Sequence, residues 1–490
     1  MANKKSWVGM LITVFIMAAC DNGTNPSSNP ISRIESTNLG TMTSSASGWR
    51  ELLDSINRDG KYVNLDLSAC TMTGTLFDPD ATVATGKDKI VSIILPDAAT
   101  SIEAGAFHDP TFKNFTNLSS VSGANITTIG NYSFVSIKLQ SVDFPNAITI
   151  GREAFWGSSL KNANFPVVQS IGEDAFSLCS DLQSISFPAS AEIGRSSSSD
   201  TYSNPFRECK KLTFTLSGSG SLSVIENSKA LVRNDTILLA YPSASGNVTM
   251  NNITSLDGNV FTDCYDLISV NFPQVTSIGE SAFYFCGSLQ SVNFPQIISI
   301  GKEAFGFCSS LQSVNFPQVT SIGEDAFSSC SSLQSVNFPQ VTSIGEHAFF
   351  GCDRLQSASF PEVITIGSGA FSLCSNLLSL NIPKVTTINS TGFFSTGDTT
   401  LTITMGSAAP TLGSYMFYDT ATAAKTVRVK VPAGASGYSP FTGSSVTVSG
   451  TNTDANWANG FRGGSWNGST WGYGGSSYIN QNITVIIEPQ

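Results

Sequence analysis

The chain has 490 residues, in which 25 Lys and Arg stand against 36 Asp and Glu for a net charge of −11. This acidic balance argues against nucleic acid as a partner, because phosphates attract basic surfaces. Charged residues make up only 12% of the chain, about half of the usual share of roughly 25%. We therefore expect an exterior that is polar but mostly uncharged.

The first 19 residues have the pattern of an export signal. Lys4 and Lys5 precede an apolar run from Trp7 to Ala19, which stops at Cys20. The pattern resembles a bacterial lipoprotein signal, which implies cleavage before Cys20 and lipidation of its thiol and new amino group. Met17 departs from the Leu that is usual at its position, so a plain secretory leader remains the alternative.

The leader also predicts where the protein is found. A lipidated Cys20 would place it on a bacterial cell surface, expected at the outer membrane, with the lipid as its only attachment to the bilayer. Residues 20–45 are rich in Ser, Thr, Asn and Gly without an apolar period, which predicts a flexible tether. Beyond the leader, no stretch reaches the roughly 18 apolar residues that a membrane span needs.

Residues 46–89 are expected to cap the array that follows. The stretch GWRELLDSINRDGKYVNLDLSAC, which begins at Gly48, predicts a helix and then a strand. A stack of repeats has open ends that must be covered. We therefore interpret this segment as an N-terminal cap.

Residues 90–432 repeat themselves. Six prolines from Pro273 to Pro383 stand 22 residues apart, and so do six cysteines from Cys264 to Cys374. Weaker copies lie upstream, and the register is broken over residues 196–260. A fixed period in the twenties predicts a solenoid.

A single copy, SSLQSVNFPQVTSIGEDAFSSC, combines several local signals. Val314 and Phe316 alternate with a polar residue as in a short strand with one buried face, and Pro317 ends that strand. Gly323 suggests a turn with positive φ, and the i, i+4 spacing of Ala326 and Cys330 suggests one helical turn. One copy buries too little to fold alone, whereas stacked copies share a core and pair their strands in parallel.

The recurring pattern LxxVxFP, IG and AFxxC resembles the Treponema-type leucine-rich repeat of the BspA-like surface proteins. The resemblance, with the stacking argument, predicts an α/β repeat solenoid. It would be a right-handed, curved array of about 22-residue units with a parallel β-sheet on its inner face and a β-rich C-terminal cap. The stretch ALVRNDTILLAYP, which begins at Ala230, resembles a hairpin insertion common in that family.

Residues 433–490 change to Gly, Asn and aromatic residues and then to an alternating run, Ile483, Val485 and Ile487. We interpret this segment as the C-terminal β cap. The alternative is a glycan-binding platform, because exposed indoles such as Trp466 and Trp471 stack on sugar rings.

The sequence offers little for catalysis. It has two histidines, His108 and His347, far apart in the array, and no GxSxG, HExxH, P-loop or CxxC motif. One cysteine per repeat in a column suits neither a zinc cage nor a disulfide, so we interpret the thiols as buried apolar fillers. We expect no enzyme, no cofactor and no metal site.

The repeated surface is then the candidate for binding. Small polar residues recur beside the buried positions of the strand, and they form the candidate face: Asn271, Asn293, Asn315, Asn337, Ser313 and Ser335. The simpler interpretation is a solvated sheet face. The functional one is a flat, repetitive patch that engages a partner at many points.

The two residues between Phe and Cys in the AFxxC motif vary from copy to copy and include aromatic residues. Phe285, Phe307 and Phe350 would be binding anchors if exposed, although packing under the next turn is the preferred interpretation. The family resemblance implies a non-enzymatic adhesin for host matrix or cell-surface proteins, or for other bacteria. It has no fixed binding motif, so it assigns no residue. A glycan-binding protein with the solenoid as a stalk is the alternative.

Overall fold

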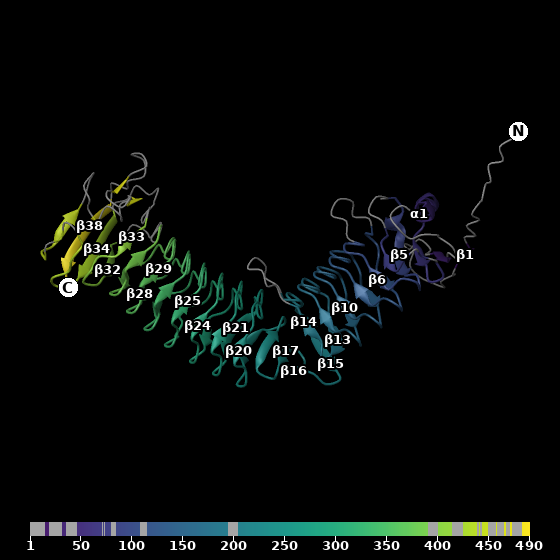
Figure 1. Ribbon diagram of the computed structural model, residues 1–490, viewed down its shortest axis with the longest axis horizontal. Helices are drawn as coiled ribbons and strands as arrows, with labels where there is room; N and C mark the ends of the chain where they lie inside the picture. The colour runs from purple at the N-terminus through teal and green to yellow at the C-terminus, as the bar shows by residue number, and fades with distance from the viewer. Residues whose placement is uncertain are drawn as a thin grey trace. The chain divides into compact units, whose positions relative to one another are not determined.

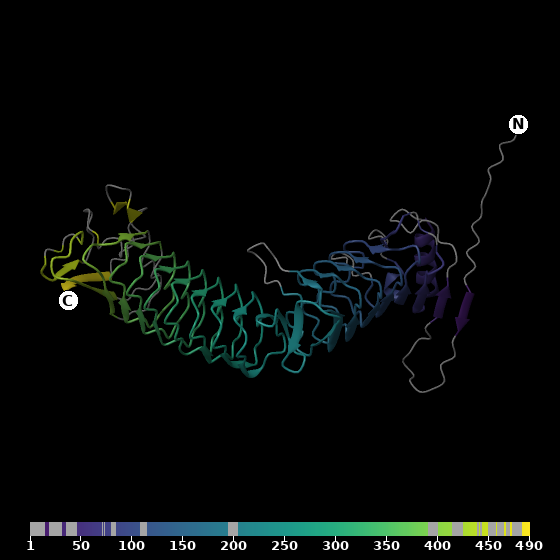
Figure 2. The same cartoon turned by 60° about the horizontal axis from the view of Figure 1, so that its bottom comes forward.

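The computed structural model describes residues 15–18, 32–35, 47–70, 72, 74–79, 85–107, 115–194, 204–390, 400–413, 425–438, 441, 443–448, 457, 465–466, 471–472 and 483–490. The chain forms two compact units, Met1–Leu231 and Val232–Gln490. Figure 1 and Figure 2 show that, within each unit, successive turns of the chain are stacked with their strands side by side. The predicted repeat solenoid with parallel strands is confirmed.

Unit 1 contains two kinds of parallel ladder, one of longer and one of two-residue strands. The longer strands are β2 (Ser32–Glu35), β3 (Val63–Asp66), β5 (Ile90–Ile94), β7 (Ser120–Ser122) and β9 (Ser141–Asp143), followed in a second sheet by β11 (Asn162–Asn164), β13 (Ser184–Pro188) and β15 (Thr213–Ser217). The short ones are β4 (Leu76–Phe77), β6 (Ser101–Ile102), β8 (Thr128–Ile129), β10 (Thr149–Ile150), β12 (Ser170–Ile171) and β14 (Glu192–Ile193). Strand β16 (Leu222–Ile225) follows, and β1 (Phe15–Ala18) pairs antiparallel with β2.

Unit 2 repeats the same arrangement. Its longer strands are β19 (Gly246–Thr249), β21 (Leu267–Asn271), β23 (Ser291–Asn293), β26 (Ser335–Asn337), β28 (Ser357–Ser359), β30 (Ser379–Asn381), β32 (Leu401–Thr404) and β34 (Lys425–Val431). Its two-residue strands are β20 (Ser255–Leu256), β22 (Ser277–Ile278), β24 (Ser299–Ile300), β25 (Ser321–Ile322), β27 (Ser343–Ile344), β29 (Thr365–Ile366), β31 (Thr387–Ile388) and β33 (Thr411–Leu412). Strand β17 (Ala230–Arg233) contains the unit boundary, and a turn with positive φ at Asn234 and Asp235 leads to β18 (Ile237–Ala240).

The register is in step with the repeat. Ser277 of β22 pairs with Ser299, Ser299 with Ser321, and Ser321 with Ser343. Each repeat therefore contributes the same residue to each rung. We predicted the longer strand from its alternation and did not anticipate the short one, because two residues carry no periodicity.

The helical turn expected at Ala326–Cys330 is absent, and a run of turns occupies this part of the repeat. Asp325 and Ser329 have positive φ, 51° and 59°. The N–H groups of Asp325, Phe327 and Ser329 donate to carbonyls of the next repeat, at 2.8, 2.8 and 2.6 Å. An isolated helical turn leaves its N–H groups without partners, whereas the neighbouring repeat supplies them here.

The expected positive φ at Gly323 is also wrong. Its φ is not positive, and a Cβ at this position would lie 2.7 Å from the backbone C of Gly301 and N of Lys302. Glycine is needed here because two successive turns of backbone touch.

The core of each unit is a column of stacked phenylalanines. In unit 2, Phe283, Phe305, Phe327, Phe349 and Phe371 lie 5.2 to 5.4 Å apart between ring centroids, within 6° of parallel. All five are fully buried. Such ring pairs contribute about 0.5–1.5 kcal/mol beyond their burial, so the column couples each repeat to the next.

The two ends differ in structure. At the N-terminal end lie helix α1 (Ser47–Asp59), which buries Leu52, Leu53 and Ile56, and the 3-10 turn η1 (Lys87–Lys89). At the C-terminal end, β34 pairs parallel with β38 (Ile483–Pro489), and β38 pairs antiparallel with β35 (Val446–Val448). A separate hairpin joins β36 (Ser465–Trp466) and β37 (Trp471–Gly472).

Cys20 and most of the predicted leader lie outside the described residues. Among the helices of the described residues, none has the length and apolar character that a membrane crossing requires.

Candidate functional site

The predicted binding face lies on the longer strands of unit 2. Asn293, Asn315 and Asn337 are exposed, whereas Asn271 is half-buried. The Nδ2 of Asn293 donates to the Oδ1 of Asn271 at 2.7 Å. Ser313 and Ser335 are exposed as well and pair through an isolated parallel bridge. The face is thus flat and polar, with part of its hydrogen-bonding capacity used between its own side chains.

A second surface lies on the turns, and we call it the aromatic edge: Tyr284, Phe285, Phe307 and Phe350. Phe285 is 38% exposed and Phe307 is 39% exposed, so neither is packed under the next turn as we preferred. Their rings stack on each other at 4.6 Å, and Tyr284 meets both edge-on, at 4.5 and 5.4 Å. Phe350 is half-buried.

The backbone beneath this edge is left-handed. Phe285 and Phe307 both have φ of 59°, and Gly351 occupies the same position two repeats later at 68°. A bulky side chain at positive φ is unfavourable by roughly 1 kcal/mol. Because these rings are more than one-third exposed and lie on unfavourable backbone, packing of the core does not require them.

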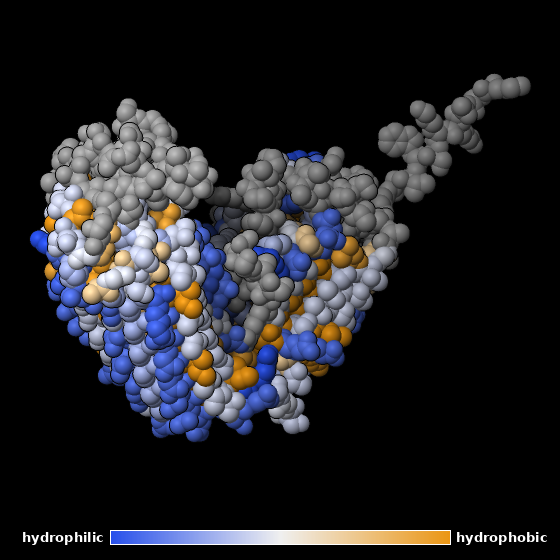
Figure 3. All heavy atoms as spheres, turned by 60° about the vertical axis from the view of Figure 1, so that its left-hand side comes forward, coloured by the Kyte–Doolittle hydropathy of each residue, from blue (hydrophilic) through white to orange (hydrophobic). Residues whose placement is uncertain are grey.

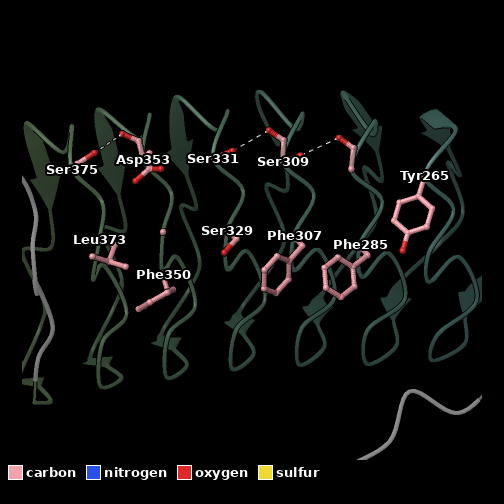
Figure 4. Close-up of a pocket in the computed structure, with 12 residues that line it drawn as sticks. Tyr265, Phe285, Phe307, Ser309, Ser329, Ser331, Phe350, Asp353, Leu373 and Ser375 are labelled. Atoms are coloured by element: carbon pink, nitrogen blue, oxygen red, sulfur yellow. Dashed lines mark hydrogen bonds between the residues drawn. The ribbon is translucent and has the colours of Figure 1, made fainter.

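The rings form one wall of an open groove of about 760 Å³, the wide groove. Figure 4 shows two rows of side chains: Phe285, Phe307, Ser329 and Leu373 in one, and Ser309, Ser331, Asp353 and Ser375 in the other. The hydroxyls of Ser309 and Ser375 donate to carbonyls of the preceding repeat at 3.3 Å. Tyr265, 42% exposed, also lines this groove.

A smaller hollow of about 250 Å³, the narrow pocket, lies beside Phe307. Its lining is Tyr284, Glu303, Phe307, Asp325, Ser328, His347 and Phe350. Small residues create it, because Gly306 and Ser328 stand at the position that Tyr284 and Phe350 fill in the flanking repeats. A Cβ at Gly306 would lie 2.8 Å from the Tyr284 ring, so glycine allows the tyrosine to lie across it.

Carboxylates surround the narrow pocket. Two columns on these turns hold Glu280, Lys302, Glu324 and Glu346, and Ser281, Glu303, Asp325 and His347. Lys302 pairs with Glu324 at 3.2 Å, and the hydroxyl of Ser281 donates to Glu303 at 3.0 Å. Desolvation raises the pKa of Asp325, partly offset by His347. Within the described part of the chain, neither Glu303 nor Asp325 forms an ion pair with a lysine or arginine.

The cysteines are buried, but they also act as donors. All nine in the described residues are free and buried. The thiol of Cys308 donates to the carbonyl of Phe283 at 3.1 Å, and Cys330 does the same to Phe305. Burial raises the pKa of both thiols. The column therefore ties each repeat to the preceding one, beyond filling space as we predicted.

The remaining candidates do not come together. His108 lies outside the described residues, and His347 is a partly exposed residue of the narrow pocket. Trp466 and Trp471 face each other in the β36–β37 hairpin register, and their side chains lie outside what the structure describes. No three His, Cys, Asp or Glu side chains gather as metal ligands would, as far as the described residues extend.

Comparison with known proteins settles the family. The model of the BspA type leucine-rich repeat region matches residues 84–213, 243–318 and 298–424, in six copies. The chain belongs to this family. Proteins built from such repeats are typically non-enzymatic scaffolds, and the BspA-type family suggests a protein-binding role.

Comparison with solved structures gives one match that supports the fold. A leucine-rich repeat protein from Eubacterium ventriosum is 23% identical, with a TM-score of 0.50, over 65% of this chain and 81% of that one. A leucine-rich repeat protein from Bacteroides ovatus is also 23% identical, with a TM-score of 0.43, over 77% and 95%. Comparison with curated proteins gives no match.

Sequence reasoning found the ring-bearing positions of the aromatic edge but missed the narrow pocket. A sequence signal for the narrow pocket was present at the two residues between Phe and Cys of each repeat. A small pair, Gly306 and Ser328, stands between two aromatic copies, while acidic residues recur just before the buried alanine. A column-by-column comparison of the copies would have shown both features.

Proposed function

We propose that the protein is a non-enzymatic adhesin of the bacterial cell surface, held there by a lipid on Cys20. Its BspA-type array binds macromolecules, namely host matrix or cell-surface proteins or other bacterial cells. The observation that carries this proposal is the aromatic edge, where Phe285 and Phe307 are more than one-third exposed on left-handed backbone. Exposed aromatic residues dominate the hot spots of protein interfaces.

The wide groove supports binding along several repeats. Its lining alternates apolar side chains with hydroxyls and spans Tyr265 to Ser375. Figure 3 shows that the coloured part of one face of the molecule is largely polar, with apolar side chains in separate patches. A partner that contacts several such patches on one rigid stack gains affinity from each.

The test is a binding screen with the purified full-length protein against host cells, matrix proteins and other bacteria. A double variant, Phe285→Gly with Phe307→Gly, should lose at least about tenfold in affinity for the partner found, as expected for hot-spot rings. The matched control is Ile298→Ser, which removes an apolar side chain that is even more exposed, at 49%, elsewhere on the same unit.

Two results would contradict the proposal. One is the absence of binding to all three classes of partner. The other is a partner for which the Phe285 and Phe307 variant and the Ile298 variant behave alike. Retention on a glycan array instead would favour the alternative function of the C-terminal aromatic residues.

A further inference from the structure

The narrow pocket combines two kinds of group that attract a cation. Three aromatic side chains line it, because Phe350 joins Tyr284 and Phe307, whose ring centroids lie 5.4 Å apart. Two carboxylates, Glu303 and Asp325, form another part of its lining. The faces of aromatic rings attract cations, most strongly where water is displaced.

The charged residues around the pocket also favour a cation. Glu280, Glu324 and Glu346 lie in the neighbouring column, and Lys302 of that column is already paired with Glu324. His347 lies 3.9 Å from Glu346 and meets Phe350 edge-on at 5.5 Å. Acidic groups therefore outnumber basic ones around the pocket, where His347 acts on Asp325 and the nearby Lys302 acts on Glu303 without an ion pair to it.

The size of the pocket limits what enters it. About 250 Å³ is below the range of roughly 300–1,000 Å³ for sites that enclose a drug-sized molecule. The hollow is also open to solvent, because Phe307 is 39% exposed. It is suited to the end of one side chain that projects from a larger partner.

From this geometry we propose that the narrow pocket binds the cationic end of a lysine or arginine side chain of the protein partner. The rings of Tyr284, Phe307 and Phe350 contact the cation, and Glu303 and Asp325 accept its hydrogen bonds. Such charge-assisted bonds are stronger than neutral ones. The inference rests on the proposed function, since it names the chemistry of the partner that the aromatic edge engages.

The experiment measures the binding of four short capped peptides to the full-length protein by ligand-observed NMR. The peptides share flanking glycines and differ at one central residue: arginine, lysine, citrulline or norleucine. We expect the arginine or lysine peptide, or both, to bind, and the neutral isosteres to bind at least about fivefold more weakly. The arginine and lysine arms decide between guanidinium and ammonium.

Variants locate the binding within the pocket. Asp325→Asn and Glu303→Gln each remove one charge with little change of shape, and asparagine tolerates the positive φ of 51° at position 325. Each variant should bind the cationic peptide about fivefold or more weakly than the parent protein does. Asp266→Asn, at an exposed carboxylate of unit 2 that lines neither the wide groove nor the narrow pocket, is the matched control and should leave binding unchanged.

The two proposals fail separately. If the full-length protein binds a partner but not the cationic peptides, or if citrulline binds as well as arginine, the cation site is wrong and the adhesin proposal stands. Equal effects of the Asp325 and Asp266 variants would also overturn the cation site. If the peptides bind in the expected order while no host or bacterial partner is found, the cation site stands and the adhesin proposal is wrong.

Discussion

Neighbouring positions on the turns differ in how much their residues vary from repeat to repeat. At the left-handed position of the aromatic edge, successive repeats carry Asp263, Phe285, Phe307, Ser329, Gly351 and Leu373, all at positive φ. Two residues before, the column holds only buried Phe in the same repeats. The core therefore requires Phe at one position, while the position two residues later carries Asp, Phe, Ser, Gly or Leu. Freedom of this kind allows a surface to acquire a function.

The first prediction compares these neighbouring positions. Phe307→Gly loses one partly exposed ring but relieves a positive φ of 59°, so the free energy of unfolding should change by less than about 1 kcal/mol. Phe305→Ala opens a cavity in the stacked column and should lose about 3–5 kcal/mol. Urea denaturation of the full-length protein measures both. Similar losses in the two variants would show that Phe307 is a packing residue.

The second prediction concerns a buried carboxyl group in unit 1. Asp174 is 8% exposed, and desolvation raises its pKa from 3.8 to about 6 despite a hydrogen bond from Ser177. The folded chain then holds this proton more tightly than the unfolded chain. Stability should fall as pH rises from about 4 to about 6 and remain low above that window.

The variant Asp174→Asn tests this directly. It keeps an acceptor for Ser177 and removes the buried charge, so at pH 7 it should raise the free energy of unfolding by roughly 3 kcal/mol. Below pH 4 the difference should vanish. Urea denaturation of both proteins from pH 3 to pH 7 measures the difference in the free energy of unfolding across this range. A variant that is less stable than the parent at pH 7 would contradict the expectation.

At the scale of the element, the repeat is held by hydrogen bonds between copies more than by bonds within each copy. The short strand, the longer strand and the run of turns all donate to or accept from a neighbouring turn of the solenoid. Such ladders require the backbones to approach closely. The glycine column after the short strand meets this requirement.

The third prediction uses two glycines of unit 2. Gly323→Ala would place a Cβ 2.7 Å from the backbone of the adjacent repeat, so the variant should lose about 2 kcal/mol or more. Gly287→Ala is the control, because its Cβ would meet only the Ser309 hydroxyl at 3.7 Å. Denaturant midpoints of the two variants decide. If both lose the same stability, the close approach at Gly323 is not the cause.

The sequence predicted the repeat length, the parallel ladder and the buried column, because these depend on periodic apolar positions such as Phe316 and Ile322. It did not predict the turns between Gly323 and Cys330. The i, i+4 spacing of Ala326 and Cys330 fits a helix when one copy is considered alone, whereas the partners of the N–H groups lie 22 residues away. The narrow pocket was missed for a related reason, since it exists only between copies.

At the scale of the whole molecule, each unit depends on how its terminal strands are covered. Strand β38 lies between β34 and β35, and Ile483, Val485 and Ile487 are fully buried. An uncovered parallel edge would offer unpaired N–H and C=O groups to other chains. We therefore expect the last described strands to protect the array from self-association.

The fourth prediction tests this cover. Val485→Asp buries a charge in β38 and should detach it, with aggregation seen by light scattering and loss of amide protection in β34 by hydrogen exchange. Thr484→Asp, at the adjacent half-buried position, is the control and should remain monodisperse. Protection of β34 that is unchanged in the Val485 variant would show that β38 is dispensable.

The buried phenylalanine column and the two variable residues that follow each of its members are under separate constraints, which has a consequence for evolution. Two adjacent copies, residues 309–330 and 331–352, differ at only three positions, so whole copies can be gained or lost by recombination with each interface preserved. The two residues between Phe and Cys of each repeat can meanwhile mutate with little effect on folding. A lineage can therefore lengthen the aromatic edge or change its binding specificity while it inherits the same scaffold.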